Sequence, residues 1–310
     1  MTLDAPLNRL SDSFFKFAVA TEENKDVTVA FINAAMRDLE AKLKRPELAS
    51  PLINDVTFLD RETSPFFKEA KLPRFDMLAR ALSGWTFHIE VQLLLDLYFM
   101  KRSFFYTISD YFLQARRGME YSDLQPVIFI AIVDFLQFGP LIRPRPWHTL
   151  HRILNVQTGD WEIREVEFHI VELPVMRQLM VYPETDFDRF LCYFGNIGGD
   201  DLMAELAVQD PNITRLMQLE EMFCADPILL RRYIIEERSH QDYLRNMDYI
   251  RMEGEERGEE RGIKLGREEG RAEGREEALF ATARRMKAMG MLDEQIVQAT
   301  GLSLNDIKAL

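Results

Sequence analysis

The chain has 310 residues, and its 47% hydrophobic content is enough to bury a sizeable core. This composition excludes collagen-like, disulfide-framework and wholly disordered proteins, and the length indicates about two domains. Lys and Arg number 38 against 51 Asp and Glu, a formal net charge of −13, so bulk charge argues against non-specific adhesion to nucleic acid or acidic membranes but leaves room for a local basic patch.

The N-terminal part of the chain alternates between helical and extended patterns. Apolar residues at helical intervals predict helices over 11–19 and 26–43, and a strand is expected over 55–59. Two segments in which apolar and polar residues alternate, 74–82 and 86–92, flank a Ser-Gly pair. This arrangement predicts a β-hairpin.

Further strands and helices are expected beyond this hairpin. A long helix is predicted over 93–117, because this segment lacks Pro and Gly and ends before a glycine. The continuous β-branched and aromatic run at 125–135 is typical of a strand buried on both faces. Two more strands are expected over 151–157 and 166–173, and residues 175–250 indicate helices interrupted by glycine and proline. The alternation predicts an α/β or α+β sheet domain.

The register of the hairpin can be predicted from its alternation, since a slip of one residue would move every side chain to the other face. The predicted register pairs positions that sum to 168. The pairs are Met77 with Val91, Ala79 with Ile89 and Ala81 with Phe87 on the apolar face, and Asp76 with Gln92, Leu78 with Glu90 and Arg80 with His88 on the other. We therefore expect Asp76, Glu90 and Gln92 to lie together.

Two carboxylates within reach of one another suit Mg²⁺, because this ion takes one or two carboxylates, keeps several waters and accepts phosphate oxygens. Such an ion lowers the pKa of a bound water and neutralises charge on phosphorus. The alternative, from spacing alone, is that Asp76 and Glu90 lie on the solvated face of a half-exposed hairpin. Their partners there would be Arg74, Arg80 or Lys101.

Several stretches of the chain resemble a known family in order and spacing. They are Asp12-Ser-Phe-Phe-Lys16, Asn33, Arg74-Phe-Asp76, Phe87-His-Ile-Glu90-Val-Gln92, Arg102, Tyr106, Gly118, Tyr121 and Pro126 with the apolar strand that follows it. Between Asp12 and Pro140 the chain resembles the PD-(D/E)xK nuclease superfamily, specifically its Rpn lineage of recombination-promoting nucleases and transposases.

The resemblance implies an α/β (α+β) fold, a restriction-endonuclease-like mixed sheet flanked by helices, with a helical C-terminal extension. It also implies that Asp76 and Glu90 bind a divalent cation, Mg²⁺ or Mn²⁺, and that Gln92 completes the catalytic set. Gln92 stands where the wider superfamily has lysine, and an amide carries no charge and only orients water or donates to phosphate. Help from a nearby cation is therefore expected. The candidate substrate contacts are Asp12, Lys16, Arg74, His88, Lys101 and Arg102.

We therefore expect a metal-dependent DNA endonuclease of a mobile-element or phage-defence type, the setting being implied by the resemblance alone. Local charge supports DNA as the partner, because nine Lys or Arg and six Asp or Glu lie between Arg61 and Arg117, and phosphate contacts need cations. The alternative is a catalytically inactive DNA-binding or interaction protein that retains the nuclease fold.

Glycines recur every four residues in the C-terminal region, at Gly254, Gly258, Gly262, Gly266, Gly270 and Gly274. On a helix a four-residue step drifts by only about 40°, so these glycines would form a stripe that a second helix can approach closely. A flexible charged linker is the alternative. Beyond them, a Thr-Gly-Leu-Ser turn between two short amphipathic segments, with Ser303 as the N-cap, resembles a helix-turn-helix. Its second segment carries only Lys308 as a cation, so we interpret it as an assembly or regulatory module, with a DNA reader as the alternative. We expect a homodimer formed through the C-terminal helical region.

The predicted organisation is a PD-(D/E)xK nuclease-like core over 1–180, a helical extension over 181–250, a Gly-repeat charged helix or linker over 251–277 and a small helix-turn-helix-like module over 278–310. Cys192 and Cys224 form no CxxC motif, which indicates a reduced, cytoplasmic protein. No secretory signal and no membrane-spanning run is recognised, so no membrane partner is expected.

Overall fold

The computed structural model describes residues 6–44, 52–59 and 76–310. Within these residues, six strands form one mixed sheet in the order β1-β2-β3-β4-β6-β5. The strands are β1 (Val56–Phe58), β2 (Met77–Ala81), β3 (Thr86–Gln92), β4 (Val127–Val133), β5 (His148–Ile153) and β6 (Ile163–Glu172). β3, β4 and β6 run parallel, and the other neighbouring pairs are antiparallel. The expectation of a mixed sheet flanked by helices is confirmed.

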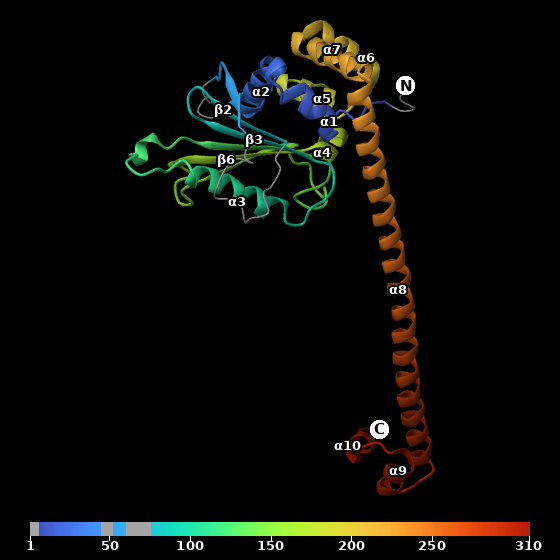
Figure 1. Cartoon of the computed structure of the whole chain (residues 1–310). Coiled ribbons are helices and arrows are strands. Elements are labelled where there is room, and N and C mark those ends of the chain that lie inside the picture. The colour runs from blue at the N-terminus through green and yellow to red at the C-terminus, as the bar shows by residue number, and fades with distance from the viewer. Residues whose placement is uncertain (1–5, 45–51, 60–75) are drawn as a thin grey trace. The chain divides into compact units, whose positions relative to one another are not determined.

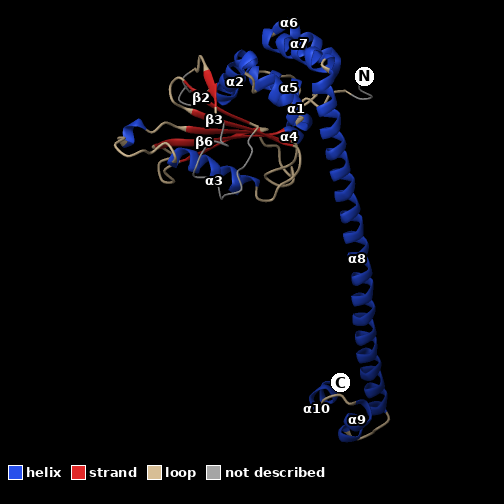
Figure 2. Ribbon diagram, in the orientation of Figure 1, coloured by secondary structure: helices blue, strands red, loops and turns tan. Residues whose placement is uncertain are grey.

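Helices cover both faces of this sheet (Figure 1). The helices of the sheet domain are α1 (Asp12–Val19), α2 (Lys25–Leu43), α3 (Phe99–Phe112), α4 (Leu173–Leu179), α5 (Asp186–Phe194), α6 (Gly199–Gln209) and α7 (Pro211–Ala225), with short 3-10 helices at Glu22–Asn24 and Tyr121–Asp123. The larger core joins one face of the sheet to α1, α2, α5 and α7. The smaller core joins the other face to α3, the helix that lies along that face of the sheet in Figure 2.

Strand β4 lies in the middle of the sheet, between β3 and β6, and all seven of its residues are buried. A parallel strand covered on both faces has no polar side, which explains its unbroken apolar sequence. The strand predicted over 125–135 is therefore confirmed. Its position also fixes β3 from one side, because every residue of β3 from Thr86 to Gln92 pairs with β4.

The β2–β3 hairpin forms where it was predicted, but the predicted register is wrong by two residues. Met77 pairs with Ile89 and Ala79 with Phe87, so paired positions sum to 166. The turn explains the difference: the N–H of Ala81 donates to the carbonyl of Trp85 at 2.9 Å, and Gly84 adopts φ +92°. A three-residue loop with glycine in the left-handed position closes the hairpin at 82–84. Because the shift is even, every side chain keeps its predicted face.

Two other elements differ from expectation at their ends. Helix α3 begins at Phe99 rather than at 93. Asp96 lies just before it and accepts hydrogen bonds from the N–H groups of Tyr98 and Phe99, through its side chain and its backbone carbonyl respectively. Strand β5 ends earlier than predicted, because Asn155 accepts a hydrogen bond from the N–H of Gly159 at 2.8 Å and the chain reverses there. The reversal lets β6 start three residues before 166, with Ile163 opposite Ile153.

The C-terminal part of the chain is helical. Helix α8 (Pro227–Ala288) contains all six regularly spaced glycines, so a helix forms there instead of a linker. Helices α9 (Asp293–Thr300) and α10 (Leu304–Ala309) follow, and Ser303 caps α10 by accepting a hydrogen bond from the N–H of Asp306. Residues 1–237 and 238–310 form separate compact units. In the second unit, Ala283, Ile296 and Ile307 make a small apolar core.

Candidate functional site

The candidate site begins at Asp76, in the bend that leads into β2. Its Oδ2 accepts a hydrogen bond from the backbone N–H of Val91 at 2.6 Å. Since Met77 pairs with Ile89, the same register continued by one residue sets Asp76 across from Glu90. The structure therefore brings Asp76 to the end of β3 that carries Glu90 and Gln92, as the sequence predicted.

Helix α1 presents two charged side chains to Asp76. The ammonium of Lys16 lies 3.7 Å from Oδ1 of Asp76 and is also paired with Asp12, one helical turn earlier. Burial raises the pKa of Asp76 to about 7, and the carboxyl group of Asp12 adds to the rise, while the Val91 N–H and the Lys16 charge act in the opposite direction. Acidic and basic groups thus gather around one buried carboxyl.

Helix α3 holds the other half of the site. One guanidinium nitrogen of Arg102 lies 3.2 Å from Oε1 of Glu90 and 3.3 Å from Oε1 of Gln92, and another lies 2.8 Å from Asp96. The amide nitrogen of Gln92 donates to the carbonyl of Leu94 at 3.0 Å. Both ends of the Gln92 amide are therefore engaged by protein groups.

The remaining predicted contacts separate into different environments. His88 shares the face of Glu90, but it is completely buried and its Nε2 pairs with Asp110 of α3. The expectation that His88 meets substrate is thus corrected: α3 packs on this face of the sheet and makes His88 a core residue. Lys101 is exposed on α3, 5.9 Å from the ring centroid of Tyr98. Arg74 lies outside the described residues.

Comparison with known proteins identifies the fold. The profile of one family, PD-(D/E)XK nuclease family transposase, matches residues 9–249. The chain belongs to this family. No curated protein and no solved structure matches it. Membership of the PD-(D/E)XK nuclease family supports a function of the nuclease type, and the matched region includes every candidate site residue.

PD-(D/E)XK nucleases generally use divalent metal ions, and the donor set of this chain fits one. Mg²⁺ takes one or two carboxylates and completes its shell with water and phosphate oxygens. Asp76 is a carboxyl with a side chain only 15% exposed, beside a second acid, Asp12, and a cation placed there would favour its charged form. The described residues contain no cluster of three or more His, Cys, Asp or Glu side chains arranged to hold a metal.

Sequence reasoning missed a buried polar chain in this PD-(D/E)XK domain. His148 lies between Asp38 of α2, 2.6 Å from its Nδ1, and His169 of β6, 3.0 Å from its Nε2. Burial lowers the pKa of His148 to about 4, although Asp38 opposes the change. His148 and His151 have HxxH spacing, a weak signal for a metal pair because no Cys or further His lies close by in the sequence. On β5 the two side chains point to opposite faces, so only His148 joins this chain.

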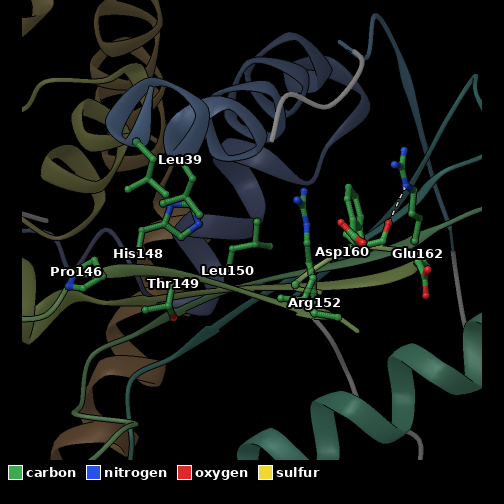
Figure 3. Close-up of a pocket in the computed structure, with 13 residues that line it drawn as sticks. Leu39, Pro146, His148, Thr149, Leu150, Arg152, Asp160 and Glu162 are labelled. Carbon is green, nitrogen blue, oxygen red and sulfur yellow. Dashed lines mark hydrogen bonds between the residues drawn. The ribbon is translucent and has the colours of Figure 1, made fainter. Parts of the chain in front are cut away.

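His148 also lines a pocket of about 870 Å³ on β5 (Figure 3). Leu39 and Leu150 form part of its apolar wall. Arg152 and Trp161 also line it, and the guanidinium of Arg152 lies 3.5 Å from the centroid of the Trp161 ring. Strand β5 is at one edge of the sheet, separated from β3 by β4 and β6. The pocket is therefore distinct from the Asp76 site.

In the part of the chain that the structure describes, no helix has the length and apolar character needed to cross a bilayer.

Proposed function

We propose that this protein is a Mg²⁺-dependent DNA endonuclease of a mobile-element or phage-defence type, in which Asp76 and Glu90 bind the metal ion. The observation that carries the proposal is the β2–β3 register, which continues to set Asp76 across from Glu90 in a chain of the PD-(D/E)XK family. Mn²⁺ would serve as well, because both ions prefer carboxylate and water oxygens.

The side chains of the site have separate tasks in this proposal. The ion, when bound, lowers the pKa of a coordinated water and offsets negative charge on phosphorus. Asp76 is held in place by the Val91 N–H, independently of any other side chain. Arg102 positions Glu90, because its guanidinium donates to both Glu90 and Gln92. The Gln92 amide is fixed in turn, because its nitrogen donates to the carbonyl of Leu94. Gln92 is therefore a positioning residue.

A second candidate function is favoured by one observation. The Arg102 guanidinium occupies Oε1 of Glu90, and a glutamine replaces the lysine of the wider motif. An ion pair of this kind offsets the negative charge that would attract a cation. A protein that binds DNA through the nuclease fold without cutting it would keep such a pair, and metal binding separates this function from the first.

The experiment uses the full chain with supercoiled plasmid DNA and Mg²⁺, beside Asp76→Asn and Glu90→Gln. Removing one metal ligand should slow cleavage by about a hundredfold or more. Cleavage that survives both substitutions contradicts the proposed site. DNA binding without cleavage in either Mg²⁺ or Mn²⁺, and without Mn²⁺ binding, supports the inactive alternative.

The partner proposed for α8 is a second copy of this chain. Each of the six glycines in α8 faces open space, with no atom within 4 Å of where a Cβ would lie, so contacts within the described chain do not require glycine. Glycine costs a helix about 1 kcal/mol per site relative to alanine. Packing of a second helix along the stripe would offset this loss of helix stability, because the glycines allow the two backbones to approach closely.

Charges beside the glycine stripe support the same partner. Residues just after the glycines are acidic at 255 and 259 and basic at 267, 271 and 275. Residues just before them are acidic at 253, basic at 257 and 261, and acidic at 269 and 273. Like charges four residues apart destabilise a single helix. In a parallel two-fold pair, the flank after the glycines meets the flank before them. Acids then face arginines in both halves of the repeat, except at Glu253, which pairs with Arg257 of its own helix.

A further inference from the structure

This inference rests on the proposed function and concerns the cation that Gln92 does not supply. A lysine at that position would place a positive charge beside the attacking water and the phosphate. The amide of Gln92 carries none, and both its ends are engaged, by Leu94 and by Arg102. Among the residues that the structure describes, three neighbouring cations are candidate sources of the charge: Lys16, Lys101 and Arg102.

The side chain of Arg102 is already engaged by other residues of the site. Its guanidinium contacts Glu90, Gln92 and Asp96, and these contacts make it a bridge within the α3 half of the site. Lys101 is the preceding residue on the same helix, about 100° away around the helix axis, and its ammonium lies 5.9 Å from the centroid of the Tyr98 ring. Neither group is placed against Asp76 by the contacts that the structure describes.

Lys16 is placed there, and α1 holds it firmly. Its ammonium lies 3.7 Å from Oδ1 of Asp76, the oxygen that the Val91 N–H leaves open, and pairs with Asp12. The flanking Phe14 and Phe15 are completely buried. The start of the helix is fixed as well, because Glu236 of α8 accepts hydrogen bonds from the N–H groups of Asp12 and Ser13.

We propose that Lys16 is the catalytic cation of this nuclease, reaching the reacting phosphate from α1 in place of a lysine at position 92. During hydrolysis a water oxygen forms a bond to phosphorus, and the bond from phosphorus to the leaving sugar oxygen breaks. One proton passes through solvent from the water to the leaving oxygen. Lys16 keeps its proton and acts through its charge on the water and on the phosphate oxygens.

The test removes the positive charge at position 16 and then restores one at position 92. Lys16→Met should lower kcat for plasmid cleavage by about a hundredfold with little change in KM. Lys16→Arg should keep part of the activity, and Gln92→Lys in the Lys16→Met background should recover at least tenfold. Lys25→Met is the matched control, because Lys25 also pairs with two carboxylates, Glu22 and Asp55, outside the site; its kcat should match the wild type.

A second readout does not depend on cleavage. Without DNA, Lys16→Met should bind Mn²⁺ several-fold more tightly than the wild type, because a positive charge beside Asp76 has been removed, and Lys25→Met should not. If Lys16→Met has the kcat and the Mn²⁺ affinity of the wild type, the assignment of Lys16 is overturned, but the proposed function is not. A loss that neither Lys16→Arg nor Gln92→Lys relieves would overturn the assignment as well. A wild-type protein that neither cleaves DNA nor binds Mn²⁺ would overturn the proposed function and this assignment with it.

Discussion

The carboxylate of Asp76 accepts a hydrogen bond from the backbone N–H of Val91, between Glu90 and Gln92. A backbone donor holds Asp76 at the end of β3 whatever side chains surround it. Asparagine has a carbonyl oxygen that can accept the same hydrogen bond, so Asp76→Asn should preserve the local geometry while removing the charge.

We expect Asp76→Asn to be more stable than the wild type in metal-free buffer near neutral pH. The pKa of Asp76 is raised from 3.8 to about 7 by burial and by Asp12, so folding becomes less favourable as pH rises through this window. The gain should reach up to about 4 kcal/mol at pH 8, because each pKa unit corresponds to about 1.4 kcal/mol, and should vanish near pH 4. Denaturant unfolding at the two pH values measures it. A wild type that is the more stable of the two at pH 8 would contradict the raised pKa.

Arg102 supports a second prediction, because one guanidinium contacts Glu90, Gln92 and Asp96. Arg102→Lys keeps the charge but cannot span three acceptors. We expect both Arg102→Lys and Arg102→Met to lower kcat by about tenfold, with DNA affinity nearly unchanged for Arg102→Lys. Arg116→Met, an exposed arginine beyond the end of α3, is the control. Equal activity of Arg102→Lys and the wild type would show that charge alone is sufficient.

The buried chain through His148 predicts loss of stability in acid. Burial lowers the pKa of His148 from 6.5 to about 4, so between these values the unfolded chain binds a proton that the folded chain does not. The contribution of His148 to the free energy of unfolding should therefore be constant above pH 6.5 and fall by about 2–3 kcal/mol by pH 4.5. Asp76 acts in the opposite direction over part of this range, so the contribution of His148 is measured as the difference between the wild type and His148→Gln. The pKa of Asp38 is lowered from 3.8, despite burial, by hydrogen bonding to His148, so its share of stability is lost only at still lower pH.

Tryptophan fluorescence measures this, since Trp85, Trp147 and Trp161 all lie in the unit spanning residues 1–237. His148→Gln should weaken the dependence on pH between 6.5 and 4.5, at some cost in overall stability because a buried partner of Asp38 and His169 changes. His240→Gln, at a partly exposed position of α8, is the matched control. The same acid slope in His148→Gln as in the wild type would assign the effect to another group.

Sequence patterns predicted strands and faces better than contacts between elements. Strand β3 was predicted over the residues it occupies, because its alternation is strict. The register was wrong because sums of 166 and 168 leave the same side chains on each face, and only the turn at Gly84 separates them. His88 was expected at the surface because the packing of α3 on its face is a tertiary contact. The approach of Lys16 to Asp76 likewise depends on how α1 packs.

The last prediction concerns the charges beside the glycine stripe of α8. Changing Glu255 and Glu259 to arginine places arginines of one copy against Arg257 and Arg261 of the other, so the dimer should weaken by at least tenfold. Adding Arg257→Glu and Arg261→Glu restores opposite charges and should restore the dimer. Sedimentation at several protein concentrations measures the dissociation constant, and circular dichroism checks that the helix persists. A monomeric wild type, or dimers of equal strength in all three proteins, would show that α8 does not pair through this stripe.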